Sequence, residues 1–285
     1  DIQLKMIGLH FLEIKMVFYG FLFVCVFIVI NGDILPGLKY IGNGYNILYG
    51  NPYSSNYVDP GYLSQIFNMS SFNSNQNVNG YQIPDGITAS ISTECNTELI
   101  YNEINGVNSY SSTLQESIDV GSSFLDFAFS GSKEYQSVYQ QTTAYDNIYT
   151  ASVTHCSAYF AELNAPFSLP NFTDNFIKYV EQLPTVYNNE TNGKYFYPFI
   201  NEYFGTHYII KTTLGGIYGI YSDIDSYSYA SFASSNLDIS QCCGFNMLSS
   251  TAAESTMTDT EITQGNDFSK IVINNITFNI GGEIP

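Results

Sequence analysis

The stretch from Tyr197 to Gly216 constrains the fold more than any other part of the chain. We expect a helix over about Phe196–Phe204 and a strand over His207–Leu214. Gly205 lies between them, and a glycine there allows the backbone to turn sharply. The glycine pair Gly215-Gly216 is expected to break the strand. This order predicts a helix–strand corner, with Thr206 and His207 hydrogen-bonded inside it.

Composition and charge exclude several classes of partner. The chain has 285 residues, 45% of them hydrophobic, which is enough for one core in a single domain. Eight basic residues, all Lys, stand against 26 acidic ones, and the net charge is −18. So few positive charges exclude nucleic acid as a partner and docking on an anionic membrane through a basic patch. Protonation of carboxylates would favour assembly, although a solvated acidic surface is the preferred interpretation.

An apolar run near the start is typical of an export signal. Met16 looks like a natural start, and residues 17–30 are unbroken apolar sequence. The run is shorter than the ~20 residues that a spanning helix needs, and its length suits the apolar region of a signal peptide. The positive charge expected before that region is missing. A buried core helix is the less favoured alternative. We predict upstream residues and signal peptide over 1–32, a domain over 33–285, and a protein that is secreted or held in a secretory organelle.

Removal of the leader leaves four cysteines, which in an exported chain indicate disulfides. The candidates are Cys95, Cys156, Cys242 and Cys243. Three pairings are open, and the adjacent Cys242 and Cys243 rarely bond each other because that ring is strained. A zinc site is the weaker alternative because no CxxC occurs, so we expect no metal.

In two long segments the spacing of the apolar and aromatic residues fits neither a helix nor a strand throughout. In residues 114–146 some aromatic residues follow helical spacing, whereas others alternate with polar or small residues as in a strand. The alternating residues are Leu125, Phe127 and Phe129. Residues 217–270 are also mixed, with alternation at Tyr227 and Tyr229.

The flanking sequence is simpler to interpret. Residues 82–91 predict a turn leading into a strand, and residues 147–160 and 270–280 predict strands. Residues 171–183 predict an amphipathic helix that ends at Pro184.

No pattern of an enzyme is present. The chain has no GxSxG, HExxH, P-loop or dinucleotide-binding glycine motif. His155 and Cys156 occupy consecutive strand positions and would point to opposite faces. We expect neither catalysis nor a cofactor.

The corner resembles the signature of the membrane-attack-complex/perforin (MACPF) family: a Tyr, six residues, an aromatic, then Gly-Thr-His-aromatic. The matching residues are Tyr197, Phe204, Gly205, Thr206, His207 and Tyr208. Gly215-Gly216 and Gly281-Gly282 also occur where the family has glycines, and Gly281-Gly282 sits where its last central strand starts. The opening residues 40–52 are similar to protist perforin-like proteins, so the resemblance covers about 35–285.

The resemblance implies an α+β fold like that of MACPF proteins and cholesterol-dependent cytolysins. This fold has a bent four-stranded antiparallel sheet flanked by two helical clusters, with the last central strand missing from this fragment. The matching clusters are residues 114–146 and 217–270, which in the family unfurl into membrane-inserting β-hairpins.

The same resemblance implies a function and its residues. Subunits would assemble into a ring or arc on a lipid bilayer and form a transmembrane β-barrel pore. The membrane-inserting candidates are Leu125, Phe127, Phe129, Tyr227 and Tyr229, and the hinge candidates are Gly215, Gly216, Gly281 and Gly282. The alternative is a non-lytic member acting in adhesion, attachment or development.

Overall fold

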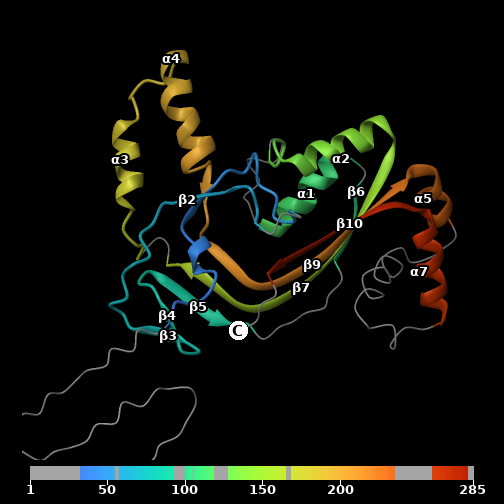
Figure 1. Cartoon of the computed structure of the whole chain (residues 1–285), viewed down its shortest axis with the longest axis horizontal. Helices are drawn as coiled ribbons and strands as arrows, with labels where there is room; N and C mark the ends of the chain where they lie inside the picture. Colours follow the sequence, from blue (N-terminus) through green and yellow to red (C-terminus); the bar gives the residue numbers. More distant parts are fainter. Residues whose placement is uncertain are drawn as a thin grey trace, which may run out of the picture. The chain divides into compact units, whose positions relative to one another are not determined.

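The computed structural model describes residues 33–54, 58–92, 100–104, 106–118, 128–164, 168–234 and 259–281. They form an α+β fold with antiparallel sheets and several helices (Figure 1). The predicted leader, residues 1–32, lies outside the described residues.

The largest sheet runs in the order β10-β9-β7-β5, and β6 also pairs with β7. Its strands are β5 (Ile87–Ile91), β6 (Ile100–Ile104), β7 (Asn147–Leu163), β9 (Lys211–Asp225) and β10 (Val272–Gly281). All pairings are antiparallel, and Figure 1 shows β7 and β9 curving together. The sheet therefore has five strands where four were expected, because β6 pairs with the first part of the long β7 and β5 with its last part.

Two smaller sheets complete the strands of the described residues. One runs in the order β2-β1-β8 and the other pairs β3 with β4. Their bounds are β1 (Asn43–Tyr45), β2 (Tyr62–Gln65), β3 (Gln76–Val78), β4 (Tyr81–Ile83) and β8 (His207–Tyr208). A positive φ at Gly86 forms the turn between β4 and β5, which agrees with the turn and strand predicted over 82–91.

The glycine pair in β9 does not end the strand, so that prediction is wrong. Gly215 pairs with Ser157 of β7, and Gly216 pairs with Gly281 of β10. Strands on both sides supply hydrogen-bond partners, and a β-bulge between Ser157 and Tyr159 absorbs the irregularity. Gly281 is the last residue of β10, and the residues after it, where the last central strand was expected to start, lie outside the described residues.

Two helical segments are inserted between strands of the large sheet. The first contains α1 (Val107–Ile118) and α2 (Lys133–Ala144), and the second contains α5 (Ser226–Ala233) and α7 (Asp259–Ile271). The second segment begins at Ser226 and not at residue 217, because residues 217–225 complete β9. The alternation at Tyr227 and Tyr229 therefore falls in a helix.

A third helical region precedes the corner. The predicted helix over 171–183 is α3 (Asp174–Gln182), capped by the hydroxyl of Thr173. The helix expected over Phe196–Phe204 starts earlier, at α4 (Asn189–Thr191), and continues through the π-helical turns Asn192–Phe196 and Phe199–Tyr203. Asn188 begins it with a capping box that includes the Thr191 side chain.

Alternation along the strands divides the core between the two faces of the sheet. Tyr149, Ala151 and Val153 of β7 are buried in one cluster with residues of α1 and α2. Ile148 and Ile224 belong to a second cluster, with residues of α5 and α7. Since successive side chains of a strand point to opposite faces, the two segments pack on opposite faces of the sheet. A third cluster joins the chain from Leu35 onward to β5 and the corner.

Candidate functional site

The corner before β8 turns at Gly205. Gly205 has a φ of 79° and forms an isolated bridge with Tyr45. A Cβ at this position would lie 2.4 Å from the carbonyl oxygen of Tyr45. Both the left-handed backbone and this close approach favour glycine, so the chain can leave the helix and lie directly against β1.

Thr206 fastens the corner to the start of the domain. Its backbone N–H donates to the carbonyl oxygen of Tyr45 at 3.0 Å, and its hydroxyl accepts from the N–H of Ile47 at 3.1 Å. The same hydroxyl lies 2.8 Å from Nδ1 of His207. Burial lowers the pKa of His207, which favours the neutral imidazole.

The aromatic residues of the signature differ in their surroundings. Phe204 is buried against the rings of Phe176 and Phe199, with centroids 5.0 and 5.3 Å away. Tyr208 contacts the Phe67 ring edge-on at 5.4 Å. Tyr197, in contrast, is 54% exposed and contributes its carbonyl oxygen to the Asn201 side chain. The geometry of the signature is that of a structural joint.

Two polar residues beside this joint, one buried and one half-buried, carry no recognisable signal of their role in the sequence. Asn46, 1% exposed, donates from Nδ2 to Oδ1 of Asn201 at 3.1 Å. The carboxylate of Asp59 accepts from the Tyr45 hydroxyl at 2.7 Å and from the backbone N–H of Gly61 at 2.8 Å. Burial is the main cause of the raised pKa of Asp59. The only signal in the sequence was the turn-like Asp-Pro-Gly at 59–61, which does not reveal burial.

The first insertion, residues 105–146, lies between two strands that are hydrogen-bonded neighbours. It leaves β6 after Ile104 and returns into β7 at Asn147, and Ile104 pairs with Tyr149. If the insertion became extended, its two ends could continue the β6–β7 pairing without a change of register.

The second insertion, residues 226–271, has the same relation to β9 and β10. It leaves β9 after Asp225 and returns at Val272, which pairs with Ile224. Tyr149 also pairs with Asp223, so both insertions leave the sheet at nearly the same row. The structure thus places two helical insertions at one end of one sheet (Figure 1).

The candidate inserting residues differ in burial. Phe129 is fully buried, and Tyr229 is 6% exposed, whereas Tyr227 is 84% exposed. Leu125 and Phe127 lie outside the described residues. Whether any of them enters a membrane stays a prediction.

The hinge and disulfide candidates are only partly described. Gly215, Gly216 and Gly281 lie together where β10 ends, nine or more residues from the insertions along β9, and Gly282 is outside the described residues. Cys156 lies in β7. Cys95, Cys242 and Cys243 are outside the described residues, so the disulfide candidates stay open.

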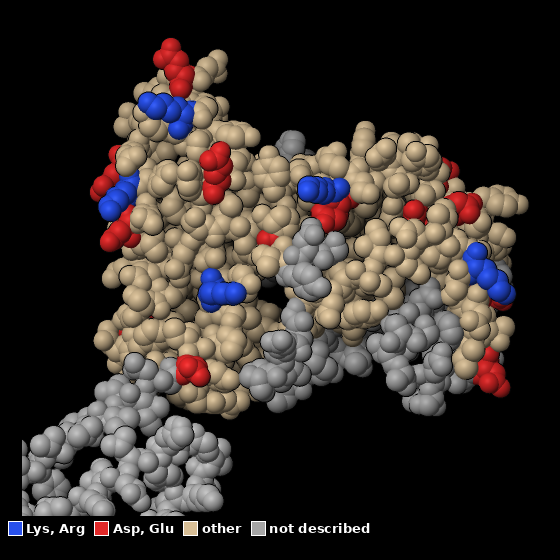
Figure 2. All heavy atoms as spheres, in the orientation of Figure 1, with Lys and Arg blue, Asp and Glu red and all other residues tan. Residues whose placement is uncertain are grey.

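No group of three or more His, Cys, Asp or Glu in the described parts of the chain is placed to hold a metal ion. Of the helices in these parts, none is long and apolar enough to cross a bilayer. Figure 2 shows the Lys side chains of the visible face lying apart from one another.

A match to a protein-family profile identifies the family of the domain that contains the corner and the insertions. The MAC/Perforin domain profile matches residues 33–285, most of the chain. The chain belongs to the MACPF family. A sequence search among curated proteins gives no match.

Solved structures show likeness to this MACPF domain at the level of the fold. GNIP1Aa from Chromobacterium piscinae is similar with a TM-score of 0.51 and 14% identity, over 87% of this chain and 44% of that chain. This chain therefore spans less than half the length of GNIP1Aa.

Two further structures are more distant. A putative cell invasion protein with MAC/Perforin domain from Bacteriodes thetaiotaomicron VPI-5482 has a TM-score of 0.41 and 11% identity, over 68% of this chain and 36% of that chain. Astrotactin-2, a conserved vertebrate-specific and perforin-like membrane protein involved in neuronal development, has a TM-score of 0.39 and 12% identity. The match covers 87% of this chain and 78% of that chain.

Proposed function

We propose that this protein is a secreted pore-forming protein that assembles on a target lipid bilayer and inserts two β-hairpins per subunit. One observation carries the proposal: both insertions join strands that are already antiparallel hydrogen-bonded neighbours, and they do so at one end of one sheet. Extension of each insertion would lengthen the existing strand pairs, so the sheet would serve as the template for the hairpins.

The insertions are long enough for this role. Each contains about 40 residues, so a hairpin arm of about 20 residues would reach ~65 Å at about 3.3 Å per residue. A tilted spanning strand needs only ~9–11 residues. Each arm could therefore cross the bilayer and still bridge a gap between the membrane surface and the sheet.

Membrane entry would require assembly. A hairpin inserted alone leaves unpaired backbone groups at its edges, and hydrocarbon does not supply partners for them. A ring or arc of subunits removes most edges because each hairpin pairs with those of its neighbours. The partners proposed are therefore a lipid bilayer and further copies of this chain, with bending of the central sheet at Gly215, Gly216 and Gly281 accompanying the change.

The test adds the protein to dye-filled liposomes at neutral and acid pH and images them by electron microscopy. We expect dye release together with rings or arcs on the same vesicles. Binding without release in every lipid and at every pH would contradict pore formation and favour the alternative, a non-lytic attachment protein.

A matched cross-link control is available at the strand ends. The hydroxyl of Ser226 donates to the carboxylate of Asp146 at 2.8 Å, directly beyond the paired residues Asn147 and Asp225. These positions would remain neighbours if β7 and β9 were extended, so a disulfide in Asp146→Cys/Ser226→Cys should leave dye release unchanged.

A further inference from the structure

A short segment near the start of the domain lies across the first insertion. This segment, residues 46–54, is called the clasp. The backbone N–H groups of Phe129 and Gly131 donate to the carbonyl oxygens of Ile47 and Leu48, each at 2.7 Å. A Cβ on Gly131 would lie 2.6 Å from the Tyr49 ring. The clasp therefore contacts the backbone of the insertion directly.

The clasp also contacts both helices of the first insertion. The Nδ2 group of Asn51 donates to the Tyr110 hydroxyl of α1 at 3.4 Å, and both residues are fully buried. The hydroxyl of Ser54 donates to the Glu134 carboxylate of α2 at 3.4 Å. One short segment thus joins α1, α2 and the turn between them.

Residues outside the insertion anchor the clasp. The hydroxyl of Thr206 accepts from the N–H of Ile47, and the carboxylate of Asp59 accepts from the N–H of Asn51 at 2.7 Å. Asp59 also accepts a hydrogen bond from the hydroxyl of Tyr45, which lies in β1. The signature corner and Asp59 can therefore keep the clasp in place without help from the helices.

The backbone of Phe129 is strained where it meets the clasp. Its φ is 65°, in the left-handed region, and its side chain is fully buried. A bulky residue rarely adopts this conformation, which is unfavourable and persists only where the surroundings hold it. The hydrogen bond to Ile47 and the buried ring supply that constraint.

We infer that the clasp locks the first insertion in its helical state and must separate from residues 128–134 before that insertion can extend. This inference rests on the proposed function and adds its regulation. While the clasp is closed, its carbonyl groups occupy the N–H groups of Phe129 and Gly131, which a hairpin strand needs for pairing with its neighbours. These contacts all go to the first insertion, whereas the second insertion packs on the opposite face of the sheet.

The first test measures hydrogen exchange of the soluble protein and needs no membrane. Asp59→Ala removes the acceptor that anchors the clasp, whereas Asp59→Asn keeps an oxygen for the N–H groups of Asn51 and Gly61. We expect Asp59→Ala to speed exchange in α1 and α2 about tenfold or more, with α5 and α7 unchanged. Asp59→Asn should leave all four helices near wild type. Unchanged α1 and α2, or an equal rise in all four helices, would overturn the inference.

The second test is a reversible cross-link that does not depend on Asp59→Ala folding. In Tyr49→Cys/Gly131→Cys, removal of the Tyr49 ring frees the space beside a side chain at residue 131, and mass spectrometry verifies that the disulfide has formed. We expect the oxidised pair to reduce dye release at least tenfold and a reductant to restore it, whereas the control pair at positions 146 and 226 continues to leak.

The outcomes separate the two ideas. Release from the oxidised 49–131 pair at the wild-type rate would contradict the inference. If wild-type protein releases no dye, the proposed function fails, and the exchange measurement decides alone whether the clasp holds the helices.

Discussion

The two insertions occupy similar places in the sheet but are held differently. The first shares a large core with the sheet and the domain's opening segment, in which Tyr45 and Ile47 pack with Tyr110 and Phe129. The second is held, in its described part, by a small cluster that contains Tyr229, Phe232 and Phe268.

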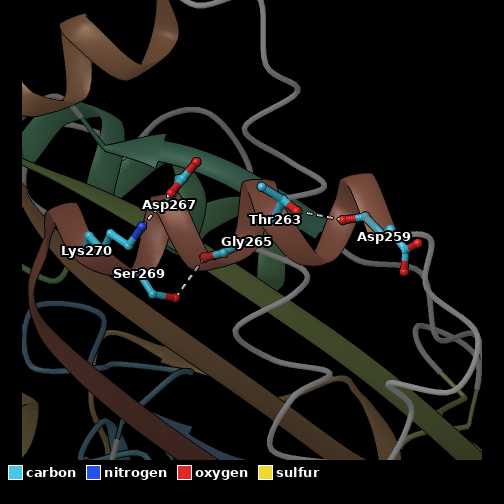
Figure 3. A network of polar contacts seen from close by, with 6 residues as sticks. All are labelled: Asp259, Thr263, Gly265, Asp267, Ser269 and Lys270. Carbon is cyan, nitrogen blue, oxygen red and sulfur yellow. Dashed lines mark hydrogen bonds and ion pairs between the residues drawn. The ribbon is translucent and has the colours of Figure 1, made fainter.

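The polar contacts of the second insertion's last helix point to the same difference. Figure 3 shows the hydroxyls of Thr263 and Ser269 donating to the backbone of α7 itself, and Lys270 paired with Asp267 at 2.7 Å. Contacts of this kind stabilise the helix but do not tie it to the sheet, and exposed ion pairs contribute little. We therefore expect the second insertion to separate from the sheet more readily than the first.

The largest expected effect comes from emptying the small core. Phe268 is fully buried, and Phe268→Ala should cost about 3–5 kcal/mol of local stability. Hydrogen exchange should rise in α5 and α7 and stay unchanged in α1 and α2. Leu114→Ala, at a fully buried position of α1, is the matched change in the large core and should lower the stability of the whole domain. If Leu114→Ala loosens only α1 and α2, the two cores do not differ as described.

A smaller effect is expected at the signature corner, which anchors the clasp. Thr206→Val keeps the shape of the side chain but leaves the N–H of Ile47 without its acceptor, a loss of about 1–3 kcal/mol. Thr206→Ser retains the hydroxyl and should be close to wild type. Thermal unfolding measures the loss, and exchange should rise in the first insertion before the second. Equal melting of the Val and Ser variants would show that the hydroxyl does not stabilise the corner.

The corner itself could be predicted from the sequence because its determinants are local. Gly205 needs a left-handed backbone, Thr206 is next to His207, and both properties can be read from neighbouring residues. The strand over 147–160 and the helix over 171–183 are likewise predicted from local sequence, the helix from the spacing of its apolar residues. In contrast, the pair Gly215-Gly216 predicts a break in the strand, whereas β9 continues because it is paired on both sides with strands from distant parts of the chain.

The clasp could not be predicted for the same reason. The Gly- and Asn-rich stretch that contains Asn46, Asn51 and Asp59 looks like an exposed loop. The contacts of Asn46 with Asn201 and of Asn51 with Tyr110, which are distant in sequence, cannot be read from it. The alternation around Phe129 suits a strand, whereas the structure buries this residue in a turn. A pattern that suits one state of an insertion does not reveal how the other state is packed.

Acid should loosen the second insertion through the cap of α5. Hydrogen bonds from Ser228 lower the pKa of Asp225, whose carboxylate accepts from the N–H of Ser228 at 2.9 Å. A lowered pKa means that this contribution is present at neutral pH and is lost only as the pH falls below about 4. Exchange of α5, corrected for its intrinsic pH dependence, should therefore rise between pH 5 and pH 3. Asp225→Asn still accepts the hydrogen bond but does not titrate, and an unchanged acid response in it would assign the effect to other groups.

The smallest effect, of opposite sign, is expected at the anchor of the clasp. Burial raises the pKa of Asp59, so the folded state binds its proton more readily than the unfolded chain does. Folding is therefore favoured by this group at low pH, and the benefit is lost as the pH rises through the raised pKa. Asp59→Asn removes the charge from this half-buried site, so at pH 7 it should melt at or slightly above the wild-type temperature, and the advantage should vanish in acid. A variant that melts well below wild type at pH 7 would show that the charge itself holds the clasp. The two carboxylates thus make the comparison of the insertions dependent on pH: acid weakens the cap of the second insertion while it favours the anchor of the first.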